Sequence, residues 1–279
     1  MFRHTALLSL LWMACFGGLT AVHAESAKDL AKSTKYLALG DSIAFGFTPL
    51  APKQGDLRDY HGYPEFVSKG AHLQVANASC FGETTAHFLS LQAPDTGCQA
   101  WRAAFPLFAD YATTQMDYTV AYLQASKKAE LVTIDIGIND LGVLLNQCNG
   151  DPTCFAAGLP PVLAAYQANL MTIFSRIRFE AGYTGPIVAV TVYTTNYADL
   201  QTLGPIAALN AVLAGVASFF NVQVADAFTA FGVASIPTGG NACTAGLLIP
   251  LPTGGCDIHP SAAGQALIAQ TVLDLVSKK

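Results

Sequence analysis

The stretch YLALGDSI, residues 36–43, combines a short apolar run with a sharp turn and a hydroxyl side chain. Residues 36–39 are typical of a strand that is buried on both faces, as in a parallel sheet. Gly40 permits a tight turn after this strand, and Ser42 then falls at the positive end of a helix dipole. We interpret Ser42 as a nucleophile and Asp41 as a brace of the turn. The alternative is that Ser42 is an ordinary helix cap.

Further runs of the same apolar character follow along the chain, and longer helical patterns lie between them. The predicted strands are residues 36–39, 73–76, 131–136, 187–193 and 222–225. The predicted helices are residues 108–125, 161–181 and 205–220, with a final helix that starts near Pro260. This alternation predicts a three-layer α/β/α fold with a mainly parallel central sheet of about five strands. No linker divides residues 25–279, which we expect to form a single domain.

Three more motifs accompany the Ser42 turn: Asn77 to Gly82, Gly137-Ile138-Asn139-Asp140, and His259-Pro260. The ends of parallel strands meet at one edge of a sheet, so Ser42, Gly82 and Asn139 should lie together. Their backbone N–H groups and the Asn139 amide can stabilise the oxyanion of an acyl-transfer reaction. Four histidines remain after residue 24, and His259 is the candidate general base, because imidazole exchanges protons near neutral pH. We expect the others to be solvated or structural, namely His61, His72 and His87.

These motifs, in this order, resemble the conserved blocks of the SGNH (GDSL-type) hydrolase family. Residues 40–43 are Gly-Asp-Ser-Ile, so Ile43 replaces the Leu of the GDSL motif that gives the family its name. The resemblance covers most of the chain from Tyr36 onward. It implies a flavodoxin-like sheet and a serine hydrolase that cleaves carboxylic esters, an esterase or lipase, through an acyl-enzyme. It also implies that Ser42 and His259 act without a metal or an organic cofactor. The alternatives are a carbohydrate O-acetylesterase at the same site, or a non-catalytic binding protein.

The acid that orients His259 is where the chain departs from the family pattern. The family usually has Asp three residues before its His, and Cys256 occupies that position. Asp257, two residues before His259, could share its face in an extended segment. Asp257 is therefore the candidate acid, and a main-chain carbonyl is the alternative.

The first 24 residues have the pattern of a secretory signal peptide. Arg3 precedes an apolar run at 6–22, and Val22-His23-Ala24 fits a cleavage site after Ala24. We expect a secreted or periplasmic protein. We expect no later run to be long and apolar enough for stable membrane insertion.

Six cysteines remain after cleavage, an even number that indicates disulfides in an exported protein. Sequence alone allows 15 pairings of six cysteines. We favour pairs of nearest neighbours, because each flanks a Gly/Pro-rich loop beside a motif and because secreted members of the family resemble this arrangement. The pairs are Cys80–Cys98, Cys148–Cys154 and Cys243–Cys256. A metal site is the alternative, but no two cysteines are separated by two residues.

Composition narrows the range of partners. The chain has 52% apolar and 12% charged residues and a net charge of −5, which suits a compact domain and disfavours a nucleic-acid partner. We expect a monomer that acts on a small-molecule or lipid ester. Two apolar loops beside the motifs are candidates for an acyl-binding groove, unless they only pack on the core. Their residues are Phe105, Phe108, Leu247, Leu248 and Leu251.

Overall fold

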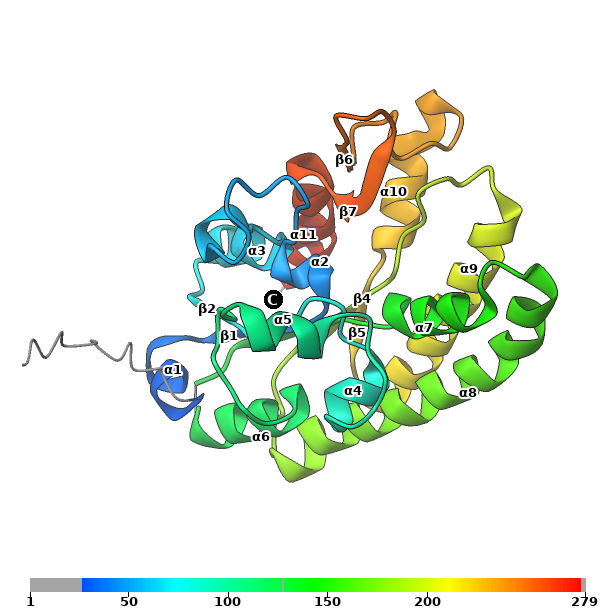
Figure 1. Cartoon of the computed structure of the whole chain (residues 1–279). Helices are drawn as coiled ribbons and strands as arrows, with labels where there is room; N and C mark the ends of the chain where they lie inside the picture. Colours follow the sequence, from blue (N-terminus) through cyan, green and yellow to red (C-terminus); the bar gives the residue numbers. More distant parts are fainter. Residues whose placement is uncertain (1–26, 127, 277–279) are drawn as a thin grey trace, which may run out of the picture.

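The computed structural model describes residues 27–126 and 128–276, so the predicted signal peptide lies outside the described residues. Its centre is a sheet of five parallel strands in the order β2-β1-β3-β4-β5 (Figure 1). The predicted α/β fold with a parallel sheet of five strands is therefore confirmed. The strands are β1 Tyr36–Gly40, β2 Val75–Asn77, β3 Leu131–Asp135, β4 Ile187–Val190 and β5 Gln223–Ala225.

Both faces of the sheet are buried, which explains why its strands are continuously apolar. Successive strand residues point to opposite faces, and in β1 Leu37 and Leu39 join one buried cluster while Tyr36 and Ala38 join another. The helices that pack in the first cluster are α1 Ala27–Ser33, α6 Gln115–Ala125, α8 Pro152–Ser175 and α9 Leu200–Phe219. The helices that pack in the second are α3 Tyr63–Ala71, α10 Ala227–Ser235 and α11 Ala262–Val276.

Shorter helices follow the carboxyl ends of the first three strands. The chain leaves β1 directly into α2 Ser42–Phe45, and β3 is followed closely by α7 Ile138–Cys148. The connection after β2 contains α4 Thr85–Leu89 and α5 Cys98–Ala104. These turns gather at one edge of the sheet (Figure 1).

The predicted helix starts were wrong by several residues, because capping side chains decide them. Thr114 caps α6 by accepting a hydrogen bond from the Asp117 N–H at 3.0 Å, so the helix does not begin at 108. Asp151 caps α8, which begins at Pro152, nine residues before the predicted start, and the helix continues through Pro160 and Pro161. α8 is then extended by one wide turn, Arg176–Glu180. Asp199 caps α9 in the same way as Asp151 caps α8.

The C-terminal region contains a hairpin that the sequence did not reveal. β6 Leu248–Pro250 pairs with β7 Cys256–Pro260 in antiparallel orientation. Pro260 ends this strand, and α11 begins two residues later at Ala262, close to the predicted start near Pro260. His259 lies on β7, beside the final helix.

α9 corrects the expectation that no run after residue 24 is apolar enough to cross a membrane. By length and composition alone, the described residues include one such helix, α9. In the structure α9 contacts α8 and β5, and Leu209, Leu213 and Val216 on one of its faces are buried. A helix that packs inside a domain can have the same composition.

Candidate active site

Ser42 occupies the first turn of α2, directly beyond β1. Asp41 caps this helix, and its Oδ1 accepts a hydrogen bond from the Ile43 N–H at 3.0 Å. The turn requires glycine at position 40, where φ is 135° and a Cβ atom would lie 2.1 Å from the Asp135 carbonyl oxygen. Only glycine avoids both the strain and the clash. The predicted brace by Asp41 and the tight turn at Gly40 are both present.

His259 and Asp257 approach Ser42 from β7. The Nε2 atom of His259 lies 2.9 Å from the Ser42 Oγ, and its Nδ1 atom is hydrogen-bonded to the Asp257 Oδ1. The same Asp257 oxygen accepts the His259 backbone N–H at 3.0 Å. The hydrogen bond from the His259 ring lowers the pKa of Asp257. The three side chains thus form a continuous Asp–His–Ser chain, in which Asp257 contacts the His259 ring nitrogen that does not face Ser42.

Gly82 and Asn139 line the same cavity as Ser42 and His259. Gly82 has a φ of 73°, and a Cβ atom there would lie 2.6 Å from the Gly97 nitrogen, so a side chain is excluded. Asn139 is near the start of α7, and its Oδ1 accepts a hydrogen bond from the Thr96 Oγ1 at 2.6 Å. Ser42, Gly82 and Asn139 therefore meet at one edge of the sheet, as their positions after three strands predict, and His259 joins them from β7.

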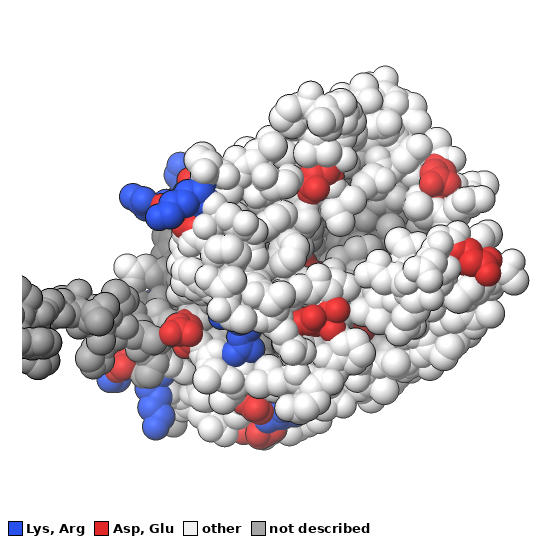
Figure 2. Space-filling view, viewed as in Figure 1, with Lys and Arg blue, Asp and Glu red and all other residues white. Residues whose placement is uncertain are grey.

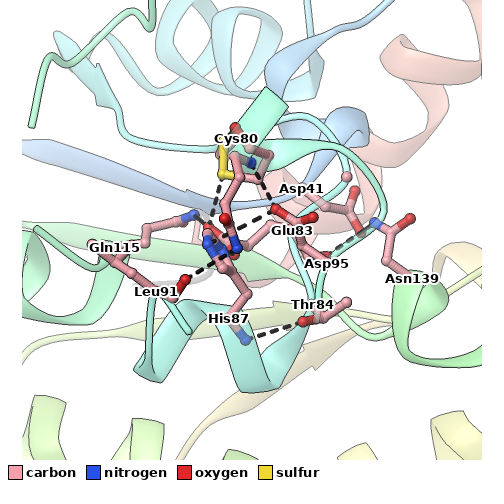
Figure 3. A network of polar contacts seen from close by, with 12 residues as sticks. Asp41, Cys80, Glu83, Thr84, His87, Leu91, Asp95, Gln115 and Asn139 are labelled. Atoms are coloured by element: carbon pink, nitrogen blue, oxygen red, sulfur yellow. Dashed lines mark hydrogen bonds and ion pairs between the residues drawn. A yellow bond between two sulfur atoms is a disulfide. The ribbon is translucent and has the colours of Figure 1, made fainter. Parts of the chain in front are cut away.

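The amide group of Asn139 is held by two acceptors. Its Nδ2 donates to the Glu83 carbonyl oxygen at 3.0 Å and to the Asp41 Oδ2 at 3.2 Å (Figure 3). Glu83 directly follows Gly82, and Asp41 directly precedes Ser42. Hydrogen bonds therefore connect Asn139 to the residue after Gly82 and to the residue before Ser42.

Gln115 is a site residue that the sequence did not indicate. Its side chain binds both backbone polar groups of Gly40, accepting from the N–H at 2.7 Å and donating to the carbonyl oxygen at 3.0 Å. Its Nε2 also donates to the Glu83 carboxylate at 3.1 Å. Gln115 lies on α6, 75 residues beyond Gly40, and a glutamine in a helix carries no sequence signal for this role.

Glu83, the residue after Gly82, forms a buried pair with His87 (Figure 3). The Glu83 carboxylate is hydrogen-bonded to the His87 Nδ1. Burial raises the pKa of Glu83, and the bonds from His87 and Gln115 oppose that shift. His87 therefore has a structural role, as expected, while its partner Glu83 was not singled out from the sequence.

The six cysteines of the described chain form three disulfides, which join Cys80 to Cys98, Cys148 to Cys154, and Cys243 to Cys256. The first encloses Gly82 and Thr96, and the third encloses β6 and ends at β7, which carries His259. Two groups of metal-ligand side chains occur among the described residues, Cys80–Glu83–Cys98 and His87–Asp95–Cys98. Both depend on cysteines of the first disulfide, which offer no thiolate for a metal.

A cavity of about 460 Å³ opens beside Ser42, but none of the five predicted acyl-binding residues lines it. Phe105 and Phe108 line a separate cavity of about 910 Å³. Leu247, just before β6, and Leu248, the first residue of β6, are buried in the core. Leu251 follows β6 without reaching the Ser42 cavity. Phe105 and Phe108 also pack partly buried against the core, so the structure does not place the five predicted acyl-binding residues at the Ser42 cavity. The cavity at Ser42 has other apolar walls, including Ile138, Leu145, Ile206 and Ile258.

The chain belongs to the GDSL-like lipase/acylhydrolase family, whose model matches residues 38–267. This is a family of esterases and lipases, and it is the family that the sequence motifs indicated. No curated protein matches the sequence.

Solved structures show the same fold at low sequence identity. Phospholipase A1 from Streptomyces albidoflavus NA297 has a TM-score of 0.56 and 20% identity, over 87% of this chain and 99% of the other. A catalytic mutant of Axe2, an acetylxylan esterase from Geobacillus stearothermophilus, has a TM-score of 0.56 and 18% identity, over 88% and 95% of the two chains. The lipase Lip_vut3 from a goat rumen metagenome has a TM-score of 0.52 and 17% identity, over 86% and 95%.

Proposed function

We propose that this protein is a serine hydrolase of carboxylic esters, an esterase or lipase that works through an acyl-enzyme. The observation that carries the proposal is the Asp257–His259–Ser42 chain, with 2.9 Å between the His259 Nε2 and the Ser42 Oγ. A base within hydrogen-bond reach of a hydroxyl, oriented in turn by a carboxylate, is the arrangement that activates serine as a nucleophile.

In the first half of the proposed reaction, the Ser42 Oγ attacks the ester carbonyl carbon while the His259 Nε2 accepts its proton. The carbonyl oxygen becomes an oxyanion, for which the N–H groups of Ser42 and Gly82 are proposed donors. The Asn139 Nδ2 is the third proposed donor, and it would give up its longer hydrogen bond, the one to Asp41, to contact the oxyanion. His259 then gives its proton to the departing alkoxide, and the alcohol leaves. Asp257 stabilises the imidazolium that exists between these two proton transfers.

In the second half, water replaces the alcohol. His259 removes a proton from the water, which attacks the acyl carbon of the acyl-Ser42 ester. Collapse of the second tetrahedral intermediate returns the proton to Ser42 and releases the carboxylic acid. The proposed chemistry requires only these side chains and water.

The three disulfides support the further proposal that the protein works in an oxidising compartment, secreted or periplasmic. Disulfides persist in such compartments and are rare in the reducing cytosol. They are consistent with the signal peptide proposed for residues 1–24.

Hydrolysis of p-nitrophenyl acetate tests the proposed activity directly. The protein should hydrolyse this ester, and Ser42→Ala should lower kcat by several orders of magnitude. Ser218→Ala is the matched control, because Ser218 is exposed on α9 and its hydroxyl only contacts the Gly215 carbonyl. Absence of hydrolysis by the parent protein, or full activity of Ser42→Ala, would contradict the proposal.

A further inference from the structure

A second apolar cavity adjoins the one at Ser42. It has a volume of about 600 Å³ and lies between α7, α8 and α9. The two cavities have walls in common, so the second extends the first away from the nucleophile. The shared residues are Ile138, Asn139, Leu145, Thr202, Ile206 and Ile258.

The walls of this extension are mainly hydrocarbon. Leu141 on α7, Phe155 and Leu159 on α8, and Pro205 on α9 line it beyond the shared residues. Asp151 is its one charged lining residue among those described, and this carboxylate is occupied in capping α8 through the Thr153 N–H at 2.9 Å. The extension therefore offers a long apolar surface with little to bind a sugar hydroxyl.

Two large apolar side chains remain accessible where the cavities meet. Leu145 is 53% exposed and Ile258, next to His259, is 57% exposed. Their position on the shared wall places them beside any substrate group that passes from Ser42 into the extension. Figure 2 shows a hollow on this face of the molecule, where charged side chains are sparse.

We propose that the joined cavities form a channel for the acyl chain of the substrate, and that the protein prefers esters of medium or long fatty acids. This inference rests on the proposed function and assigns the acyl-binding residues that the sequence placed elsewhere. An acetyl group would leave the extension unused. A longer chain would cover Leu145, Ile206 and Ile258 first, and then Phe155, Leu159 and Pro205.

Each methylene that the channel removes from water should raise kcat/KM by up to about fourfold, if its burial is retained in the transition state. The ratio of kcat/KM for p-nitrophenyl decanoate to that for the acetate should therefore be well above one. The series of acetate, butyrate, octanoate and decanoate measures how far the channel is used.

Neighbouring alanines on α8 provide a matched pair of variants. Ala156 is exposed to the channel and lines it, whereas Ala157 is exposed and lines neither cavity. Ala156→Trp should fill the far part of the channel and lower the decanoate-to-acetate ratio at least about tenfold. Ala157→Trp should leave the ratio unchanged. If Ala156→Trp does not fold, Leu145→Gln tests the shared wall, and the ratio should fall again.

The results distinguish failure of the proposed channel from failure of the proposed esterase activity. A fall in kcat/KM from acetate onward, or an unchanged ratio in both channel variants, would overturn the channel and leave the esterase intact. Failure to hydrolyse any ester, acetate included, would overturn the proposed function itself.

Discussion

Asp41 and Asp135 share a hydrogen bond between their buried carboxyl groups, directly behind the nucleophile turn. The Asp41 N–H also donates to the Asp135 carbonyl oxygen at 3.2 Å. Two carboxyl groups can bond in this way only if one retains its proton. Burial, followed by the charge of Asp41, raises the pKa of Asp135 well above its usual range. We infer that Asp135 keeps the proton and donates it to Asp41, which in turn accepts from Asn139.

Buried carboxyl groups should make the protein less stable as the pH rises from about 4 to about 7. Burial raises the pKa of Asp41 and of Glu65 to about 7 and that of Asp140 to about 6. In this window the folded protein holds protons that the unfolded chain releases, so the free energy of unfolding falls with rising pH. Asp257 has a lowered pKa and acts in the opposite sense, losing its contribution only at lower pH.

Urea unfolding between pH 4 and 8 measures this slope. Glu65→Gln should flatten it, because the variant removes a carboxyl group that folding shields from water. Asp274→Asn, at an exposed position on α11, should leave the slope unchanged. A free energy of unfolding that rises steadily across this range would contradict the buried-acid account.

Asn139→Ala should lower kcat by about 10²–10³ with little change in KM, because an oxyanion donor acts mainly in the transition state. Asn146→Ala, at an exposed position on the same helix, is the control. Steady-state kinetics with p-nitrophenyl acetate compare the two variants. A change confined to KM would mean that Asn139 binds the ground-state substrate only.

Asp257→Asn should lower kcat by about 10²–10⁴, since the imidazolium loses its charged partner and the neutral ring loses its tautomer. The Asp257 side chain is 25% exposed, so water can replace part of the interaction and the lower end of the range applies. The ester assay with Asp257→Asn measures this loss. Activity near that of the parent protein would instead support a Ser42–His259 dyad.

Removal of the Cys80–Cys98 disulfide should destabilise the protein by about 3 kcal/mol and lower kcat as well. The two cysteines of this bridge are separated by 18 positions in the sequence, and the loop between them contains Gly82 and Thr96. The sequence separation of Cys148 and Cys154 is only 6, so removal of their bridge should cost about 2 kcal/mol and affect acetate hydrolysis less. Chemical denaturation of the two double Cys→Ser variants gives the comparison. A larger loss for the shorter loop would contradict it.

The fold and the meeting of the motifs were predictable because both depend on local patterns. Buried parallel strands have a recognisable composition, and the position of Ser42, Gly82 and Asn139 after successive strands fixes the edge at which they meet. Asp257 was predictable from the extended geometry of residues two apart.

The other features of the site depend on contacts between residues that are far apart in the sequence. Gln115 reaches Gly40 from another helix, and Asp135 meets Asp41 only across paired strands. An apolar run alone does not distinguish a core segment from the wall of a binding groove. The run that contains Leu247 therefore predicts a groove, whereas the structure has Leu247 in the core. The channel residues were missed for the same reason, because α7, α8 and α9 line it together.

Mass spectrometry after treatment with a fluorophosphonate tests the central claim most directly. The reagent transfers its phosphonyl group to an activated serine oxygen with loss of fluoride. We expect one adduct, on the peptide that contains Ser42, and none on that peptide in Ser42→Ala or in protein denatured before treatment. An adduct on another serine, or a parent protein that remains unlabelled, would contradict the assignment of Ser42 as the nucleophile.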